Sequence, residues 1–183
     1  MSVERKKYRI IIQRAISGVI AIAICIIIPG FKEDKEEYTI KALFIYNFTK
    51  YIEWPEQELP PQFNIGVLGE SAISEKLSVI LKGKKIYNRT VQINELKGLE
   101  EISNQQIVFV TKGSSSKIKQ ILEKVGSGKI LIVAEDVNMA AKGSGINIIE
   151  KNERMKFEMN EAAIKKSGLK VSGQLYDLAI QVK

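Results

Sequence analysis

The chain has 183 residues, enough for one domain, and its 45% apolar and 27% charged residues are typical of a globular protein. The formal net charge of +7 does not indicate nucleic-acid binding, because +4 of it lies in the first thirty residues and only +3 in the rest. The absence of histidine excludes the commonest general base and histidine metal sites. The single cysteine, Cys25, excludes an intrachain disulfide and a cysteine metal cluster. We therefore expect no cofactor, no metal and no nucleic-acid partner.

The first thirty residues have the pattern of an export signal. Basic residues precede an uncharged run over 15–28, which Pro29 and Gly30 end. The run is shorter than the ~20 residues of a spanning helix. Its small-x-small triplet lies inside the apolar run, and Cys25 has a bulky residue before it, so a cleaved signal peptide and an uncleaved anchor both stay open for 1–30. In both cases the rest of the chain is exported.

A charged spacer over 31–37 and one domain over 38–183 are predicted to follow the signal or anchor. The domain begins with a helix over 38–54 whose apolar residues cover more than one face, and Pro55 ends it. The next predicted elements, in chain order, are a buried strand over 63–69, a helix over 72–82 with Ser71 as its N-cap, and strands over 90–93 and 106–110.

The second half of the domain continues the alternation of strands and helices. Its predicted elements are a helix that starts after Ser115 or Ser116 and ends at Gly126, a strand over 129–135, a short helix over 136–141, a strand over 146–150 with a hairpin arm over 156–159, and a helix from Asn160 to Gly168. This order predicts an α/β fold, a single compact domain with a mixed, mostly parallel sheet flanked by helices.

Two segments rich in glycine and serine have the strand-to-helix order of an anion site. Gly69 and Ser71 follow one predicted strand, and Ser114 lies in GSSSK, 113–117, after another. A helix N-terminus presents N–H groups to an anion, but tight turns and caps explain the same residues. The GSGK segment over 126–129 follows a helix and precedes a strand, the reverse of a phosphate loop.

The sequence offers little support for catalysis. Glu135 and Asp136 follow a predicted strand, but adjacent residues in a turn usually point apart, and Asp136 is also a natural N-cap. With no histidine in the chain and no cysteine after residue 30, we expect a protein that is not an enzyme.

The predicted first helix carries an aromatic set made of Tyr46, Phe48, Tyr51 and Trp54. Core packing is the simplest explanation, but the apolar surface of this helix is wider than one sheet face would bury. Aromatic residues concentrate at protein interfaces. Tyr46, Tyr51 and Trp54 are therefore candidate partner-binding residues.

The segment KALFIYNFTKYIEWP, 41–55, resembles the opening of the YfiR-like family, an aromatic helix that ends in Trp-Pro. The segments FNIGVLG, GKKIYNRTVQI, QIVFV and ILIVAE follow in the family's order. Residues 145–182 resemble its closing block, in which Arg154, Phe157 and Asn160 match the late motif. The resemblance extends over essentially the whole exported domain.

This resemblance implies a periplasmic regulator that restrains a membrane-bound diguanylate cyclase through the periplasmic sensor domain of the cyclase, and it implies a homodimer. Family members with this role can carry disulfides, which the domain lacks. Redox control therefore does not carry over, and the identity of the partner stays open.

The late motif adds two candidate residues. Arg154 is a candidate for contact with a partner or ligand, because a guanidinium binds carboxylate or phosphate with two hydrogen bonds. A surface ion pair with Glu153 or Glu158 would explain it equally well. Asn160 joins Gly69, Ser71 and Ser114 as a candidate ligand-binding residue, with a helix N-cap as the alternative.

Two functions follow from the sequence. The first is an exported regulatory protein that contacts the periplasmic domain of a membrane signalling protein, such as a diguanylate cyclase or a sensor kinase. The second is a periplasmic sensor that binds a small molecule or anion at the strand-end loops.

Overall fold

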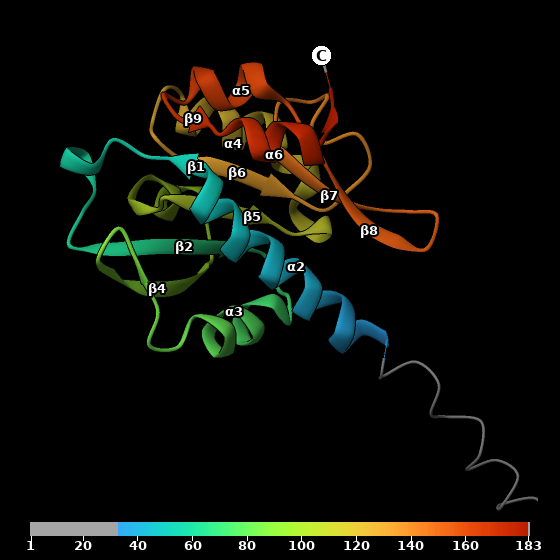
Figure 1. The fold of residues 1–183 in the computed structure, drawn as a ribbon, viewed down its shortest axis with the longest axis horizontal. Coiled ribbons are helices and arrows are strands. Elements are labelled where there is room, and N and C mark those ends of the chain that lie inside the picture. Colours follow the sequence, from blue (N-terminus) through green and yellow to red (C-terminus); the bar gives the residue numbers. More distant parts are fainter. Residues whose placement is uncertain (1–32, 183) are drawn as a thin grey trace, which may run out of the picture. The chain divides into compact units, whose positions relative to one another are not determined.

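A sheet of eight strands is the frame of the structure, a computed structural model that describes residues 33–182 (Figure 1). The predicted export signal over 1–30 and Cys25 lie outside the described residues. In sheet order the strands are β10 (Ile180–Gln181), β8 (Arg154–Met159), β7 (Ile146–Lys151), β6 (Leu131–Ala134), β5 (Ile107–Val110), β2 (Gln62–Leu68), β4 (Arg89–Leu96) and β3 (Lys85–Ile86).

Five neighbouring strands, from β4 through β2, β5 and β6 to β7, run parallel. β8 runs antiparallel to β7, and β3 runs antiparallel to β4. A separate antiparallel pair joins β1 (Ile52–Glu53) to β9 (Lys170–Val171). From Tyr38 onward the described chain forms one compact unit, so the predicted single α/β domain with a mixed, mostly parallel sheet is confirmed.

The central strands are buried on both faces, and their side chains alternate between two core clusters. Ile107 and Phe109 of β5 belong to one cluster, and Val108 and Val110 belong to the other. This alternation follows from the two-residue period of a strand, and burial on both faces explains the continuous apolar sequence.

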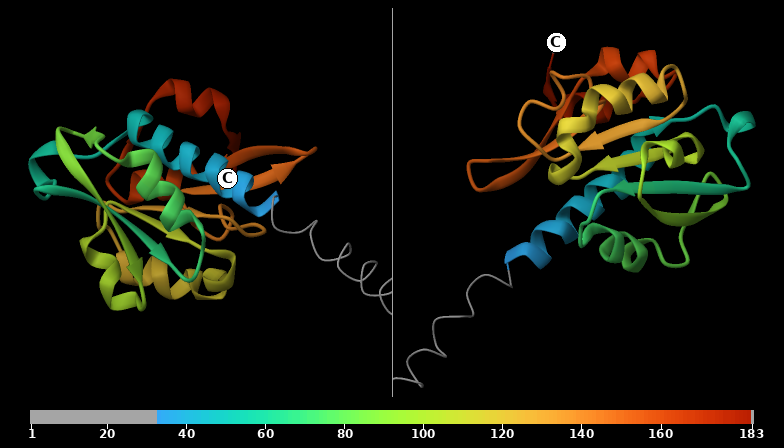
Figure 2. Two further views of the ribbon diagram at one scale, coloured as in Figure 1. Left: turned by 90° about the horizontal axis from the view of Figure 1, so that it is seen from below. Right: turned by 180° about the vertical axis from the view of Figure 1, so that it is seen from behind.

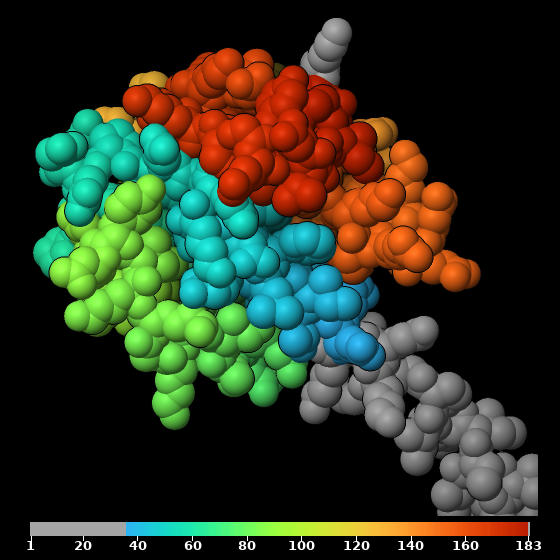
Figure 3. Space-filling view, viewed as in Figure 1, coloured from blue at the N-terminus to red at the C-terminus, as the bar shows by residue number. Residues whose placement is uncertain are grey.

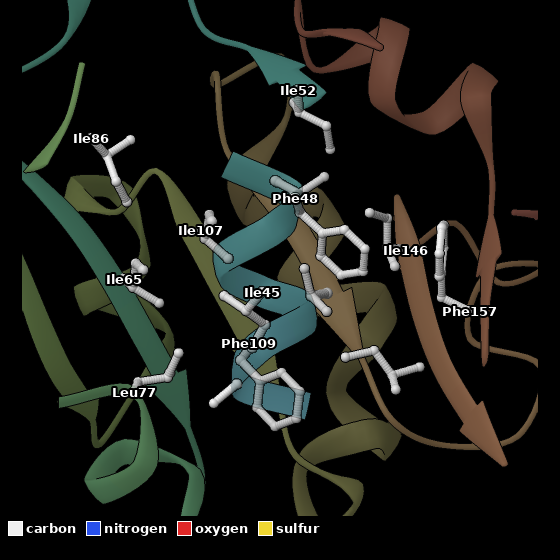
Figure 4. Packing of buried hydrophobic residues seen from close by; sticks show 14 of the residues in the cluster. Ile45, Phe48, Ile52, Ile65, Leu77, Ile86, Ile107, Phe109, Ile146 and Phe157 are labelled. Carbon is white, nitrogen blue, oxygen red and sulfur yellow. The ribbon is translucent and has the colours of Figure 1, made fainter. Parts of the chain in front are cut away.

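Helices cover both faces of the sheet. The first cluster includes residues of α2 (Glu33–Tyr51), α3 (Ile73–Leu81), α5 (Glu161–Lys166) and α6 (Gly173–Leu178). The second includes residues of α4 (Ile118–Val125) and of the short 3-10 helix η2 (Leu99–Asn104). Figure 2 (right) shows α4 in front of the sheet and α2 behind it. Figure 4 shows Ile45 and Phe48 of α2 directed toward the strands, with Phe48 on the side of Phe157 of β8.

The first helix has different limits from those predicted. It begins at Glu33 rather than at Tyr38, so part of the predicted charged spacer is helical. The helix ends at Tyr51, because Ile52 and the following residue leave it to pair with β9.

Trp54, the last residue before the proline, is a core residue. Its side chain is 3% exposed, and its indole N–H donates to the carbonyl oxygen of Lys129 at 3.0 Å. Its ring meets those of Phe63 and Tyr87 edge-on, with centroids 5.2 and 6.4 Å away. These contacts attach the end of the first helix to the start of β6.

Several predicted helix ends are confirmed. Asn160 is the N-cap of α5, and its side chain accepts from the backbone N–H of Ala163. Gly126 ends α4 and Gly168 follows α5, both with positive φ, where glycine avoids the strain of a side chain.

Two local predictions are wrong. Residues 136–141 form turns rather than a helix, because Asn138 has φ +60°, which breaks helical geometry. Neither Ser115 nor Ser116 caps α4. The 3-10 helix η3 (Lys112–Lys117) precedes it, and the hydroxyl of Ser115 donates to Asp136 instead.

The burial of Trp54 gives a direct test, because it is the only tryptophan in the chain. Its fluorescence should be blue-shifted relative to the unfolded chain and weakly quenched by acrylamide. A Trp54→Phe, Leu43→Trp variant moves the reporter to a 44% exposed position and provides the control. Equal quenching of the two proteins would contradict the buried position of Trp54.

Candidate functional site

The carboxyl ends of β2, β5 and β6 form the part of the sheet where α/β proteins usually bind ligands. The connection from β2 to β4 runs through α3 on one face, and the connection from β5 to β6 runs through α4 on the other. The chain therefore has a topological switch point between β2 and β5. The predicted residues Gly69, Ser71 and Ser114 all follow these strands.

The structure brings these three residues together, but their contacts are structural. Gly69 has φ +98°, and a Cβ atom there would lie 2.3 Å from Oγ1 of Thr111 and 2.5 Å from Oγ of Ser114. Glycine is therefore required for the two loops to pack. Ser71 is not the N-cap of α3 as predicted, because Ala72 holds that position. The hydroxyl oxygen of Ser71 accepts from the N–H of Ile73, the first residue of α3, at 3.3 Å. A ligand at this point would compete with these contacts.

A buried ion pair lies at the end of β6. Nζ of Lys41 in α2 is 2.6 Å from Oε2 of Glu135, and the two side chains are only 7% and 4% exposed. Oε1 of Glu135 accepts from the backbone N–H of Lys112 at 3.1 Å. Glu135 lies two residues after Val133 and so faces α2. The sequence did not predict this pair. The signal available in it was a lysine within the apolar surface of the first helix.

The neighbouring Asp136 is held by hydrogen bonds. Ser115 donates its hydroxyl to Oδ2 at 2.6 Å, and the N–H of Val137 donates to Oδ1 at 2.8 Å. These bonds favour the ionised form and hold the pKa of Asp136 below its ordinary value, the hydrogen bond from Ser115 being the largest cause. The Asp136 carboxylate, held in its ionised form, therefore suits a structural role better than the role of a proton donor.

Asn160 and Arg154 lie apart from these loops. Both polar ends of the Asn160 side chain are used, because its amide donates to the carbonyl of Ala140 and its oxygen caps α5. Residues of α4 and α5, with Asn160, line a hollow of about 370 Å³.

Arg154 is exposed at the start of β8, after a two-residue turn in which both residues have positive φ. Within 33–182 no ion pair joins it to Glu153 or Glu158, and Glu158 instead accepts from Asn147. Arg154 lies three residues before Phe157, which faces α2, so its side chain lies on the opposite face of the strand. The structure does not bring Arg154 together with the other candidates.

The aromatic candidates of the first helix differ in exposure. Tyr46 and Tyr51 are half-buried, whereas Trp54 lies in the core and offers no surface to a partner. Nζ of Lys50 lies 4.3 Å and Nζ of Lys84 5.2 Å from the ring centre of Tyr46, close enough for cation–π attraction. Tyr46 therefore combines an apolar ring with a basic margin.

Exposed apolar residues occur mainly on three helices that cover one face of the sheet. Within the described part of the chain six large apolar side chains are well exposed, and five of them lie on α2, α3 and α6. Figure 3 shows these three helices side by side on one face of the molecule. We call this set the apolar helical surface; its members are Ile40, Leu43, Val79, Tyr176 and Leu178.

Between residues 33 and 182 no three acidic side chains come close enough to hold a metal ion. No helix in that range has the length and apolar composition to cross a membrane.

Comparison with known proteins gives one family and a likeness of fold. The model of the family described as DUF4154, YfiR/HmsC-like, matches residues 38–180. No curated protein matches the chain. A conserved domain protein from Vibrio cholerae O1 biovar El Tor is similar in structure, with a TM-score of 0.53 and 10% identity over 80% of this chain and 60% of that chain. At this identity the likeness concerns the fold alone.

A second solved structure, an ABC domain in complex with L-Trp from Streptococcus pneumonia, has a TM-score of 0.45 and 14% identity over 66% of this chain. This chain spans only 55% and 60% of the lengths of the two solved chains.

The buried ion pair predicts a strong dependence of stability on both partners. Replacing Lys41 by Met should lower the free energy of unfolding by about 3 kcal/mol, because Glu135 is left charged and buried. The double replacement Lys41→Met, Glu135→Leu should cost clearly less than the sum of the single changes. The measurement is urea unfolding followed by circular dichroism. Lys165→Met, which breaks the exposed pair with Glu161, is the control and should cost about 0.5 kcal/mol or less.

The Ser115 hydrogen bond predicts a change in the titration of Asp136. Because this bond lowers the pKa, Asp136 stabilises the folded state above its ordinary pKa of 3.8, and this contribution is lost as the pH falls through the lowered value. Ser115→Ala should raise the Asp136 pKa, measured by NMR of the carboxyl carbon. Ser116→Ala, at an exposed neighbour, should leave it unchanged. An unchanged titration in Ser115→Ala would refute the assignment.

Proposed function

The chain belongs to the YfiR/HmsC-like family, and from this we propose that it is an exported regulatory protein that acts by binding a membrane-bound signalling protein. The partner would be a diguanylate cyclase or a sensor kinase, contacted at its domain outside the cytoplasmic membrane. In this proposal residues 1–30 export or anchor the chain, and the periplasmic domain over 38–183 makes the contact.

The apolar helical surface is the observation that carries the proposal. Leu43 is 44% exposed and Leu178 is 69% exposed, and both lie on helices that cover the same face of the sheet. Isolated apolar side chains on a surface are ordinary, but a group of them on adjacent helices marks a protein-binding site. Half-buried Tyr46 and its two lysines provide the polar margin expected of such an interface.

The polar side chains of the strand-end loops are engaged in contacts within the fold. The carboxylates of Glu135 and Asp136 and the hydroxyl groups of Thr111 and Ser115 are all engaged in internal hydrogen bonds. A catalytic group needs an accessible proton or lone pair at the reacting atom. The polar groups at the strand ends, where α/β proteins usually have their active site, therefore stabilise the fold.

A second role, the sensing of a small molecule, is favoured by one observation. The hollow of about 370 Å³ between α4 and α5 is lined by apolar residues of both elements and by Lys142 and Lys166. An amphipathic anion of modest size would suit this lining. Binding there is compatible with the regulatory role, because α4 packs on the sheet face opposite to α2.

Site-specific photo-cross-linking tests the regulatory role. A photoreactive amino acid placed at Leu43 or Leu178 in the full chain, in the source cell, should cross-link one membrane signalling protein. The same group at Lys119, on exposed α4, is the matched control and should give no such product. Products of equal yield from both faces would contradict a partner surface on the helices.

The consequence for signalling is measured with a double variant. Leu43→Asp with Leu178→Asp changes two exposed positions, so the thermal unfolding midpoint should stay close to that of the parent chain. The cross-link should be lost, and the activity of the captured protein, for a cyclase its production of cyclic di-GMP, should change at least several-fold. An unchanged activity with the cross-link lost would refute the regulatory role.

A further inference from the structure

The outer edge of β4 is largely unpaired within the described chain. β3 pairs with only the first two residues of β4, Arg89 and Thr90. Along Val91–Leu96 the strand has β2 on one side and, among residues 33–182, no strand on the other. Such an edge presents unpaired backbone N–H and C=O groups, and another strand can pair with them.

The side chains of this edge also favour an added strand. Val91 and Ile93 are half-buried, and their register with Phe63 and Ile65 places them on the same face of the sheet as α3. Together with Leu81 of α3 they line a hollow of about 580 Å³. An adjacent strand could bury its alternate apolar side chains in this hollow.

The two ends of the edge carry opposite charges. Where β4 begins, the hollow is lined by three lysines and no carboxylate; the lysines are Lys82, Lys84 and Lys85. Where β4 ends, a second hollow of about 480 Å³ is lined by Glu70 and Glu95, with one lysine beside them. The lysines and glutamates of both ends are exposed. The edge is therefore basic at its beginning and mainly acidic at its end.

A second copy of this chain fits this charge pattern. When two identical strands pair antiparallel, the beginning of each lies beside the end of the other. The three lysines of one copy then face Glu70 and Glu95 of the second copy, and the same contact occurs twice about a two-fold axis. In a parallel pairing like charges would meet, which disfavours that arrangement.

We propose that two copies of this chain associate through their β4 edges as antiparallel neighbours and so form one continuous sheet. The family resemblance implied a homodimer without a surface for it, and this proposal assigns one. It does not depend on a membrane partner, so the cross-linking experiment and the assembly experiment can succeed or fail separately.

The charge pattern allows a reciprocal test in the full chain, purified in a non-ionic detergent. We expect Lys82→Glu with Lys85→Glu to weaken the dimer at least tenfold, because both ends of the edge become acidic. We expect Glu70→Lys with Glu95→Lys to weaken it equally, because both ends become basic. An equimolar mixture of the two variants should restore a heterodimer, because each altered end then faces its complement. Sedimentation equilibrium in density-matched buffer measures the mass.

Two further measurements keep the test specific. Lys119→Glu with Lys124→Glu makes the same charge change on α4 and should leave the dimer intact. Hydrogen exchange of the parent chain should slow over 91–96 as the concentration rises, which reports backbone pairing rather than charge alone. Far-ultraviolet circular dichroism verifies that every variant is folded.

The proposal is overturned if the mixture stays monomeric or if each charge-reversed variant alone remains as dimeric as the parent chain. It is also overturned if the parent chain is monomeric and 91–96 stay unprotected at every concentration. That last result would mean that β4 does not pair with a second copy of this chain. An extended segment of a different protein would then be the remaining candidate for pairing at this edge.

Discussion

The buried ion pair between Lys41 and Glu135 constrains the position of α2 on the sheet. Two charges removed from water must be paired, so the helix cannot slide or rotate without leaving a carboxylate buried and unpaired. Just after its C-terminal end the chain is held by Trp54, whose indole N–H donates to a backbone carbonyl near the start of β6. α2 is thus fixed on the sheet near its middle and just beyond its C-terminal end, and this fixes which of its apolar side chains stay exposed.

This constraint connects the fold to the proposed function. At the strand ends that form ligand sites in many α/β proteins, polar groups are here engaged in the ion pair, in the Ser115–Asp136 hydrogen bond and in the close packing at Gly69. Polar groups used in this way hold the loops together. What the domain offers to other molecules is instead its surface, namely the apolar residues of α2, α3 and α6 on one face and the open edge of β4.

These two surfaces are of different kinds, and they can act together. The apolar helical surface offers side chains on three adjacent helices, which suits a folded partner domain. The β4 edge offers backbone groups and an ordered pattern of charge, which suits a second strand. Pairing at the sheet edge leaves α2 and α6 exposed, so a dimer could still bind a membrane protein. Regulation by an assembled pair would give each copy the same access to its partner.

The sequence by itself determined the elements and their class, because apolar runs, glycines and caps act locally. It identified the buried strands, the hairpin of β7 and β8, and the caps at Asn160 and Gly126. Only the tertiary structure decided which polar residues are engaged in contacts within the fold. Lys41 and Glu135 are 94 positions apart, and Trp54 reaches a carbonyl 75 positions away, so no local pattern reports either contact. Whether an aromatic residue faces the core or a partner depends on the neighbours that folding places around it, and these come from distant strands.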